Sequence, residues 1–546
     1  MAAGAPKAVG TAPTSNWVTL NVGGHLVTTS RTTLMADPTS QLYAMFSPDS
    51  TWHLDTDKDG NVLVDADPQY FLPILNFLRY NEVVIPPSVP ARGVHAAASY
   101  FNVQGVLDYF NRDKRQVIFS WGSGGSGELG TLDKADVLTP TVVTIVAYDV
   151  RVTEVALGAN YSCVLTSSGK VYTFGNGDWG QLGLGNPKLF HEKADDKTPI
   201  VMVPMLVKSL EAKKVVSVAC GYAYAMALTE NHEVYFWGNN NHGQSGLGEA
   251  FFGASYRKIE EPVLVETLQG KKIVQLGCGS FFVLALSEDG SIYSWGLVDC
   301  VGHGTLEQIQ EVVDAEDIAE SVSKDKRTVL LKPRKVAMPT KDKVVRINAG
   351  QWHSCAITEK GELYTWGVGF QGRLGHGDKE PCFVPVRVTA SLEGQRVVDL
   401  ACGSFHTVAL TDEGTVFCWG DNANGQCGSG TLPEAVTWPH HVPNLRVIGG
   451  GVAKAVSCGR QHTAVVMNGP HPWCTNYCCR LRHDGKPQAD HGQVYVFGES
   501  KGMGLGAAMK VCNAKLVPGM EQYNVQSVVS GLHHTFVLAE VIPSAP

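Results

Sequence analysis

The chain lacks the features that would place it on a membrane or on nucleic acid. Its 546 residues contain no run of 18 or more apolar residues, the length that suggests a bilayer-spanning helix. Acidic residues outnumber basic ones by 52 to 44, whereas nucleic-acid-binding domains are basic. Residues 1–15 contain one Lys and no apolar segment, and we expect a disordered tail rather than a signal peptide. We therefore expect neither a membrane nor a nucleic acid among the partners.

Cysteine is absent from the first 162 residues, and the 14 cysteines all follow. Several of them recur at or beside apolar positions of a repeated pattern: Cys163, Cys220, Cys278, Cys355, Cys402 and Cys458. Such regular placement indicates small buried residues rather than a disulfide framework. The cysteines thus predict a reducing compartment, the cytosol or the nucleus.

Catalytic signatures are also missing. No nucleophile with a base and an orienting group stands out, no phosphate-binding loop precedes a helix, and no paired-carboxylate motif is present. A catalytic set assembled from separate repeats would not be visible in this way. The 59 glycines belong to turns. We expect a protein that is not an enzyme and holds no cofactor.

What the chain does contain is an interval of 17 residues between two glycines. It recurs from Gly158 to Gly175, Gly221 to Gly238, Gly279 to Gly296, Gly350 to Gly367 and Gly403 to Gly420. Each interval has two alternating apolar runs joined by a polar turn, and it ends in an aromatic residue followed by glycine. This pattern predicts a β-hairpin. Repeats of such a unit at about 40–70 residues indicate a propeller or a similar array.

The count of these hairpins predicts a closed ring. The sixth copy starts at Gly459 and reaches Gly498 after 39 residues, so it carries an insertion of 22 residues. The seventh starts at Gly531, and the chain ends before its aromatic-glycine half. The missing half matches residues 117–122, which have no glycine half of their own. We therefore predict seven blades, the last completed by an N-terminal strand, since closure removes exposed edges.

Two repeated side chains are interpreted as structural. His353, His406, His462 and His534 share one position, but Tyr161, Tyr224 and Phe282 occupy it in the other copies, so a metal ring is disfavoured. The aromatic residue before the second glycine is expected in the core of every copy. These residues are Trp121, Phe174, Trp237, Trp295, Trp366, Trp419 and Phe497.

The N-terminal segment resembles a potassium-channel-tetramerisation-type BTB/POZ domain. The resemblance rests on Leu20-Asn21-Val22-Gly23-Gly24, the Thr-Ser-x-x-Thr-Leu run from Thr29, Asp65-Ala66-Asp67-Pro68 and Phe77-Leu78-Arg79-Tyr80. The pattern predicts a hairpin around Gly23-Gly24, a short helix capped by Ser30, a strand over 62–64 and a core helix that starts after Asp67. The resemblance implies a small α/β fold that forms ring oligomers or engages a cullin. The zinc of some members is not expected, because this segment has no cysteine.

Residues from about 117 to 540 resemble the regulator of chromosome condensation family, a seven-bladed propeller. Gly180-Gln181-Leu182-Gly183 and Gly403-Ser404-Phe405-His406-Thr407 carry the resemblance. A photoreceptor of this type uses tryptophan-rich repeats, and only Trp352 comes close, which favours a structural role for it. The expected organisation is a tail over 1–15, a BTB/POZ domain over 16–110, a linker over 111–116, an all-β propeller over 117–540 and a tail over 541–546.

Two insertions carry candidate sites. The one in the sixth copy contains Cys474, Cys478, Cys479 and His483, which could hold Zn²⁺, although their spacing matches no strong pattern and an exposed loop is favoured. The other, residues 306–322, follows the third copy and predicts an amphipathic helix that carries Leu306, Ile309 and Val313 on one side. This stripe packs against its own propeller or, as the less favoured alternative, binds a partner.

Together these features predict a protein-interaction adaptor. The BTB domain would oligomerise and contact a cullin, and the propeller would hold a protein substrate for ubiquitination. The candidate cullin contacts are Tyr43, Met45, Phe46, Tyr80, Asn81 and Glu82, which also fit plain core packing. Two alternatives stay open: a non-catalytic scaffold of a stable assembly, and nucleotide exchange on a small GTPase by analogy with one member of the propeller family.

Overall fold

The computed structural model divides the chain into two compact units, Met1–Arg115 and Gln116–Pro546. It describes residues 16–541 apart from 82, 87–88, 108, 110–115, 144–150, 186–198, 431–432, 444, 446–450, 470–490, 500 and 508. The expected tail over 1–15 and linker residues 111–115 lie outside the described residues. Within the described ranges, no helix is both long enough and apolar enough to cross a bilayer.

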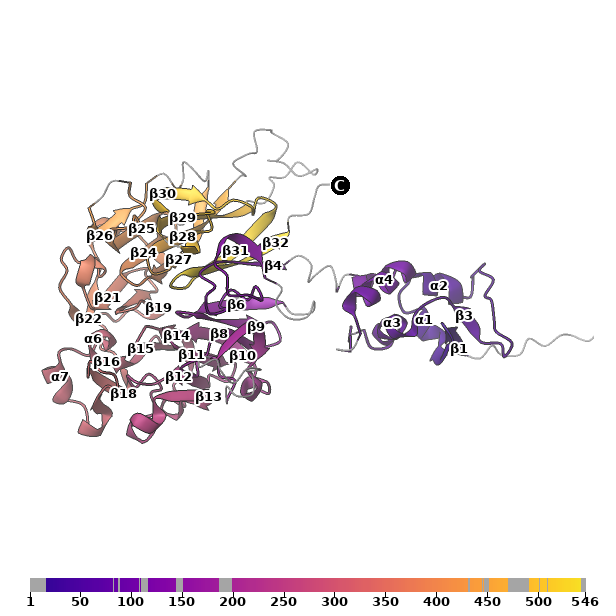
Figure 1. Ribbon diagram of the computed structural model, residues 1–546, viewed down its shortest axis with the longest axis horizontal. Helices are drawn as coiled ribbons and strands as arrows, with labels where there is room; N and C mark the ends of the chain where they lie inside the picture. The colour runs from indigo at the N-terminus through magenta and orange to yellow at the C-terminus, as the bar shows by residue number, and fades with distance from the viewer. Residues whose placement is uncertain are drawn as a thin grey trace, which may run out of the picture. The chain divides into compact units, whose positions relative to one another are not determined.

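The first unit is a small α/β domain (Figure 1). Its three strands lie in the order β2-β1-β3. The strands are β1 (Trp17–Val22), β2 (His25–Ser30) and β3 (Val62–Val64), and the helices are α1 (Arg31–Leu34), α2 (Gln41–Phe46), α3 (Pro68–Tyr80) and α4 (Ala91–Phe101). The hairpin, the short helix, the strand and the core helix that the sequence predicts are all present.

Caps and a single core explain why this segment folds as it does. The Ser30 hydroxyl accepts a hydrogen bond from the Thr33 amide, and Asp67 accepts one from the Gln69 amide. Both satisfy backbone donors that the first turn of a helix leaves unpaired. The apolar side of α3 is fully buried against the sheet and α4, with Phe71 and Phe101 in edge contact at 5.2 Å.

The second unit is a ring of seven sheets, each of at least four antiparallel strands. We number the blades from the first complete sheet in the chain. Blade 1 contains β6 (Val152–Leu157), β7 (Tyr161–Thr166), β8 (Val171–Asn176) and β9 (Ile200–Leu206), and blade 2 contains β10 (Val215–Cys220), β11 (Tyr224–Thr229), β12 (Val234–Asn239) and β13 (Lys258–Leu264). Blade 3 contains β14 (Ile273–Cys278), β15 (Phe282–Ser287), β16 (Ile292–Leu297), β17 (Ile318–Glu320) and β18 (Thr328–Lys335). Blade 4 contains β19 (Val344–Ala349), β20 (His353–Thr358), β21 (Leu363–Gly367) and β22 (Cys382–Arg387). Blade 5 contains β23 (Val397–Cys402), β24 (His406–Thr411), β25 (Val416–Asp421) and β26 (Ala435–His441); blade 6 contains β27 (Val452–Cys458), β28 (His462–Gly469), β29 (His491–Glu499) and β30 (Lys510–Leu516); blade 7 contains β31 (Tyr523–Ser530), β32 (His534–Val541), β4 (Gln116–Gly122) and β5 (Val137–Val142).

Blade 7 closes the ring as the sequence predicts. Its strand order is β31-β32-β4-β5, and the register pairs Trp121 with Thr535 and Val117 with Ala539. Figure 1 shows β4, from the start of the propeller, beside the yellow β32 from its end. β4 begins at Gln116 and β32 ends at Val541, so the ring takes one residue from the expected linker and one from the expected tail.

Neighbouring blades are joined by a repeated hydrogen-bond pair. The indole of Trp419 in blade 5 donates to the carbonyl of Arg373 in blade 4 at 2.9 Å, and the Thr407 hydroxyl donates to the same carbonyl at 2.9 Å. Trp121 and Thr535 of blade 7 share the Gly502 carbonyl of blade 6 in the same way. The seven aromatic residues predicted for the core are all fully buried.

The glycine after each aromatic residue is dictated by this packing. Gly420 has φ +110°, and a Cβ there would lie 2.6 Å from the Cα of His406 on the paired strand. Only glycine combines a positive φ with so close a backbone approach.

The single helix predicted over 306–322 is wrong. The structure has an α-helix only over α7 (Leu306–Gln310), which a Thr305–Gln308 capping box starts. One 3-10 turn follows at Ala315–Asp317, and residues 318–320 form strand β17. β17 pairs with the free edge of β18, and an unpaired strand edge offers backbone hydrogen bonds that a helix could not use. Ile309 and Val313 are buried against the side chains of Val298 and Leu330, so these two residues of the stripe pack on their own propeller, whereas Leu306 is half-buried outside this cluster.

Candidate functional site

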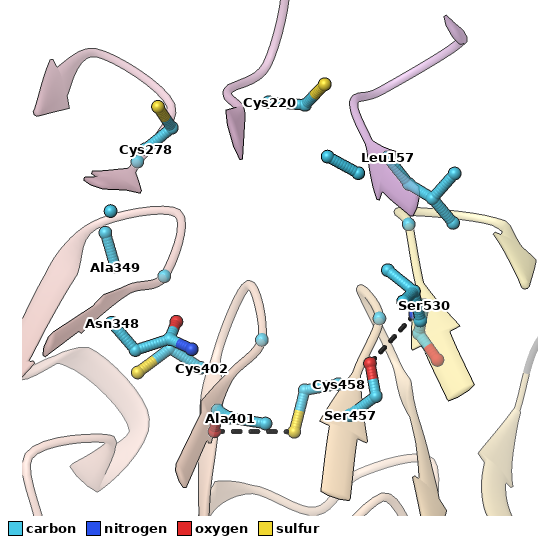
Figure 2. Close-up of a pocket in the computed structure, with 18 of the residues that line it drawn as sticks. Leu157, Cys220, Cys278, Asn348, Ala349, Ala401, Cys402, Ser457, Cys458 and Ser530 are labelled. Atoms are coloured by element: carbon cyan, nitrogen blue, oxygen red, sulfur yellow. Dashed lines mark hydrogen bonds between the residues drawn. The ribbon is translucent and has the colours of Figure 1, made fainter. Parts of the chain in front are cut away.

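The inner strands of the seven blades surround a central cavity of about 480 Å³. Figure 2 shows the last residue of each inner strand around it. These residues are Leu157, Cys220, Cys278, Ala349, Cys402, Cys458 and Ser530. Side chains from neighbouring blades join the wall, as where Ser457 accepts a hydrogen bond from the Ser530 amide at 2.8 Å (Figure 2).

Polar side chains along the cavity wall mostly bridge one inner strand to the next. Gln275 both donates to the carbonyl and accepts from the amide of Ile347, at 2.9 and 3.0 Å. Glu154 accepts from the Val218 amide at 3.1 Å, while burial raises the pKa of its carboxyl. Arg346 pairs with Asp399 at 3.3 Å. Because these side chains already have hydrogen-bond or ion-pair partners on the neighbouring strand, the wall serves to hold the ring closed.

The loops at one end of the inner strands carry a run of aromatic side chains. Each loop follows a repeat glycine, and in blades 2–5 its variable positions hold the four residues that we call the aromatic arc: Tyr222, Phe281, Trp352 and Phe405. The ring centroids of Tyr222 and Phe281 are 6.4 Å apart, and those of Phe281 and Trp352 are 5.2 Å apart. Tyr222 is 45% exposed, and the other three are half-buried.

Two arginines pack against the aromatic arc, one of them half-buried and the other buried. The guanidinium of Arg327 lies 4.9 Å from the centre of the Trp352 ring, and that of Arg373 lies 4.9 Å from the centre of the Phe405 ring. Arg373 is buried and donates to the carbonyls of Phe370 and Ser404, and burial lowers its pKa to about 10. Aromatic and arginine side chains are the residues most enriched in the energetic centres of protein interfaces.

The end of the blade 3 insertion and the residues that follow it, up to the start of β18, reach the arc. Val322 donates its amide to the carbonyl of Asn241, and Ser323 is hydrogen-bonded to His242 at 3.3 Å. His242 lies against Phe281, with ring centres 4.3 Å apart, and burial lowers its pKa to about 4. The sequence pointed to Leu306, Ile309 and Val313 in this insertion, whereas the residue that reaches the arc is Arg327, which follows the insertion just before β18.

The sequence interpretation did not identify the aromatic arc, because it considered Trp352 without the aromatic residues in the loops of the neighbouring copies. The available signal was the loop after each repeat glycine, where four consecutive copies hold an aromatic residue. The four repeated histidines, by contrast, are core residues as predicted. Each is fully buried, and the Nε2 of His353, for example, is hydrogen-bonded to the Thr407 hydroxyl at 2.8 Å.

The six candidate cullin contacts divide by exposure. Tyr43 and Tyr80 are exposed, by 36% and 73%, and Asn81 is an exposed left-handed residue that ends α3. Met45 is half-buried against the domain core. Phe46 is 2% exposed and packs among the core side chains, so the structure removes it from any contact surface. Glu82 lies outside the described residues.

The outer face of the three-stranded sheet in the first unit carries exposed apolar side chains. Leu26 and Leu63 flank Asn21 in register on the two neighbouring strands, and they are 57% and 46% exposed. Trp17, on the same side of β1, is 67% exposed. A face of this kind is typical of a surface that another protein covers. The zinc candidates Cys474, Cys478, Cys479 and His483 lie outside the described residues.

Comparison with known proteins identifies both units. Residues 117–484 match the RCC1-like domain family, and residues 18–109 match the BTB/POZ domain family. The human E3 ubiquitin-protein ligase HERC2 is 32% identical over 352 residues, which is 63% of this chain and 6% of that protein. This chain therefore spans only a small part of that relative's length.

Two further similarities concern the propeller. The secretion-regulating guanine nucleotide exchange factor of Bos taurus is 26% identical over 427 residues, 74% of this chain and 85% of that protein. The crystal structure of human WBSCR16 superposes with a TM-score of 0.60 at 21% identity, covering 78% of this chain and all of that one. At this identity the superposition shows the fold alone.

Proposed function

The chain belongs to the RCC1-like domain family and carries a BTB/POZ domain ahead of its propeller, and on this premise we propose that it is a non-enzymatic adaptor. The BTB domain would self-associate and bind a cullin, and the propeller would hold a protein substrate for ubiquitination. The aromatic arc is the observation that carries the proposal. It gathers Tyr, Phe, Trp and Arg side chains at one end of the ring, which is the composition of an interface centre.

Joining a self-associating domain to a recognition domain has a physical advantage. Each oligomer would present several propellers, and a substrate held by one copy would meet the next at high effective concentration. The similarity of the propeller to a ubiquitin ligase is consistent with this role, although it covers a small part of that ligase.

The BTB half of the proposal is tested by cullin binding. We expect purified full-length protein to bind a cullin at micromolar concentrations or below. Tyr43→Ala and Tyr80→Ala should each weaken binding about tenfold, as truncation of an interface aromatic does. Trp52→Ala is the matched control, since Trp52 is also an exposed aromatic of this domain, at 55%, and is outside the candidate set. No binding to any cullin would reject this half.

The propeller half is tested by comparing proteins that co-purify with each variant. Trp352→Ala and Tyr222→Ala should lose the substrate and keep the cullin, whereas Tyr43→Ala should do the reverse. Trp438→Ala, which removes a 46% exposed aromatic from the outer strand β26, should lose neither. A stable set of co-purifying proteins that is never ubiquitinated would instead favour a scaffold.

Nucleotide exchange is the second candidate, favoured by the similarity to an exchange factor along 85% of its length. A nucleotide-release assay against a panel of small GTPases distinguishes it. Acceleration of release that Trp352→Ala abolishes would support exchange, and absence of acceleration by the wild-type protein would exclude it for that panel.

A further inference from the structure

Three metal-ligating side chains meet between blades 4 and 5. His353 and Cys355 are the first and third residues of β20, and Cys402 is the last residue of β23. One ligand atom from each lies within 4.8 Å of the other two. The Cys402 thiol donates to the sulfur of Cys355 at 3.1 Å. Nδ1 of the fully buried His353, like Nδ1 of the other three repeated histidines, has no hydrogen-bond partner among the described residues, but only His353 has two thiols beside it.

The propeller repeat explains how the two cysteines meet. The third residue of the second strand in one blade faces the last residue of the inner strand in the next. The same relation places Cys163 beside Cys220 between blades 1 and 2, where the Cys220 side chain raises the pKa of Cys163. The first position of that strand is Tyr161, whose hydroxyl donates to backbone carbonyls of blade 2. In the described part of the chain, therefore, two thiols and an imidazole come together at one place.

We propose that His353, Cys355 and Cys402 bind one thiophilic divalent cation of the Zn²⁺ type, with water from the central cavity as the fourth ligand. In a tetrahedral zinc site, ligand atoms lie roughly 3.3–3.8 Å from one another. The two sulfur atoms are 3.1 Å apart, so they need to move apart by less than about 1 Å. Thiolates with an imidazole are a ligand set that selects zinc.

The charge balance suits a buried site. Each thiol releases a proton to the cavity water as its sulfur binds the metal, and the neutral imidazole loses none. A divalent cation with two thiolates has no net charge, so burial carries little penalty from an uncompensated ion.

The site is also accessible. Cys402 is half-buried and lies in the wall of the central cavity, as Figure 2 shows, whereas His353 and Cys355 are fully buried behind it. An ion that enters the cavity meets Cys402 first. The other cavity thiols, Cys220, Cys278 and Cys458, belong to no such group in the described residues.

The chain supplies mild variants for the test. Each substitution installs the residue that another blade carries at the matching position. Cys402→Ala corresponds to Ala349, Cys355→Ala to Ala464, and His353→Phe to Phe282. Cys220→Ala is the matched control, because it makes the same change at the same position of another blade. All variants are made in full-length protein that also carries Cys474→Ser, Cys478→Ser and Cys479→Ser, so that the blade 6 insertion does not contribute thiolates.

The measurement is titration of the reduced, metal-free protein with Co²⁺, followed by displacement with Zn²⁺. Thiolate-to-cobalt charge-transfer absorption reports the ligands, and circular dichroism confirms that each variant is folded. We expect one Co²⁺ per chain, with affinity lowered at least about a hundredfold by each of the three site variants and changed less than about threefold by Cys220→Ala.

Three results would overturn the proposal. They are no charge-transfer band in the starting protein, an equal loss of affinity in Cys220→Ala, and a Cys355–Cys402 disulfide in the protein as isolated. If Cys402→Ala does not fold, His353→Phe gives the same decision, since the affinity for Co²⁺ must fall when the imidazole is removed.

Discussion

At the scale of single residues, the propeller uses histidine as a core side chain. His462 and His534 are fully buried, and burial lowers the pKa of each from 6.5 to about 3. His462 is hydrogen-bonded to the Thr535 hydroxyl of the next blade at 3.2 Å. The native state therefore holds both imidazoles neutral at pH values where an unfolded chain would protonate them.

Acid should destabilise the propeller through these groups. The contribution of each histidine to the free energy of unfolding is fully present above pH 6.5. Between pH 6.5 and about 3 only the unfolded chain takes up the proton, so this contribution falls by up to about 1.4 kcal/mol for each pH unit. His462→Tyr replaces one of these histidines by the residue that blades 1 and 2 carry at this position. We expect the free energy of unfolding to fall less steeply with falling pH, by the contribution of one histidine. Urea unfolding at pH 7, 5.5 and 4.5 measures it, and an unchanged slope would contradict the assignment.

The repeated tryptophans offer a matched pair of substitutions. Trp419 Nε1 donates to the Arg373 carbonyl, whereas the equally buried Trp366 Nε1 has no partner among the described residues. Both Trp→Phe changes lose similar apolar contact, but only Trp419→Phe loses a hydrogen bond. We expect Trp419→Phe to cost about 0.5–1.5 kcal/mol more than Trp366→Phe in the free energy of unfolding. Equal costs in a denaturant titration would show that the bond contributes nothing.

At the scale of elements, regular hairpins could be predicted from the sequence because their determinants are local. The alternating runs, the polar turn and the terminal aromatic-glycine pair of Gly403 to Gly420 lie within one interval, and β24 and β25 form there. Even the closing strand β4 was predictable, since it left an unmatched half-repeat at each end of the chain. The Ser30 and Asp67 caps are local in the same sense.

Features that depend on contacts between elements could not be predicted in the same way. β17 exists because the edge of β18 is free, and no pattern within residues 306–322 reports that edge. Phe46 was a candidate contact because its sequence neighbours do not reveal that it packs into the domain core. The Cys355–Cys402 pair joins residues 47 positions apart, and only the ring geometry places them together.

Closure by β4 leads to a prediction about truncation. Removal of residues 1–110 should leave a folded propeller, because β4 begins at Gln116 and keeps its full register with β32. Removal of residues 1–123 should prevent folding, since it exposes the edge of β32 and deletes the fully buried Trp121, whose loss alone costs about 3–5 kcal/mol. Soluble yield and thermal unfolding of the two truncations measure this. Similar stability of both would mean that the ring closes without β4.

At the scale of the whole molecule, the self-association that we propose for the BTB domain would determine how many propellers act together. The outer sheet face, with Leu26 and Leu63 on either side of Asn21, is an exposed apolar surface of that domain. Burial of such side chains between copies would contribute about 1.5–3 kcal/mol for each one fully covered. This surface is therefore our candidate for the contact between subunits.

Charge on this face should separate the subunits. Leu26→Lys combined with Leu63→Lys buries two ammonium groups in every contact, and we expect dissociation to monomers with the fold of each domain retained. Sedimentation equilibrium of the full-length protein measures the change in mass, and Val84→Lys, at a side chain that is 55% exposed elsewhere in the same domain, is the control. Monomers should still bind cullin through Tyr43 and Tyr80 but should hold a multivalent substrate more weakly, because avidity is lost. An oligomer that survives the double substitution would place the subunit contact on another face.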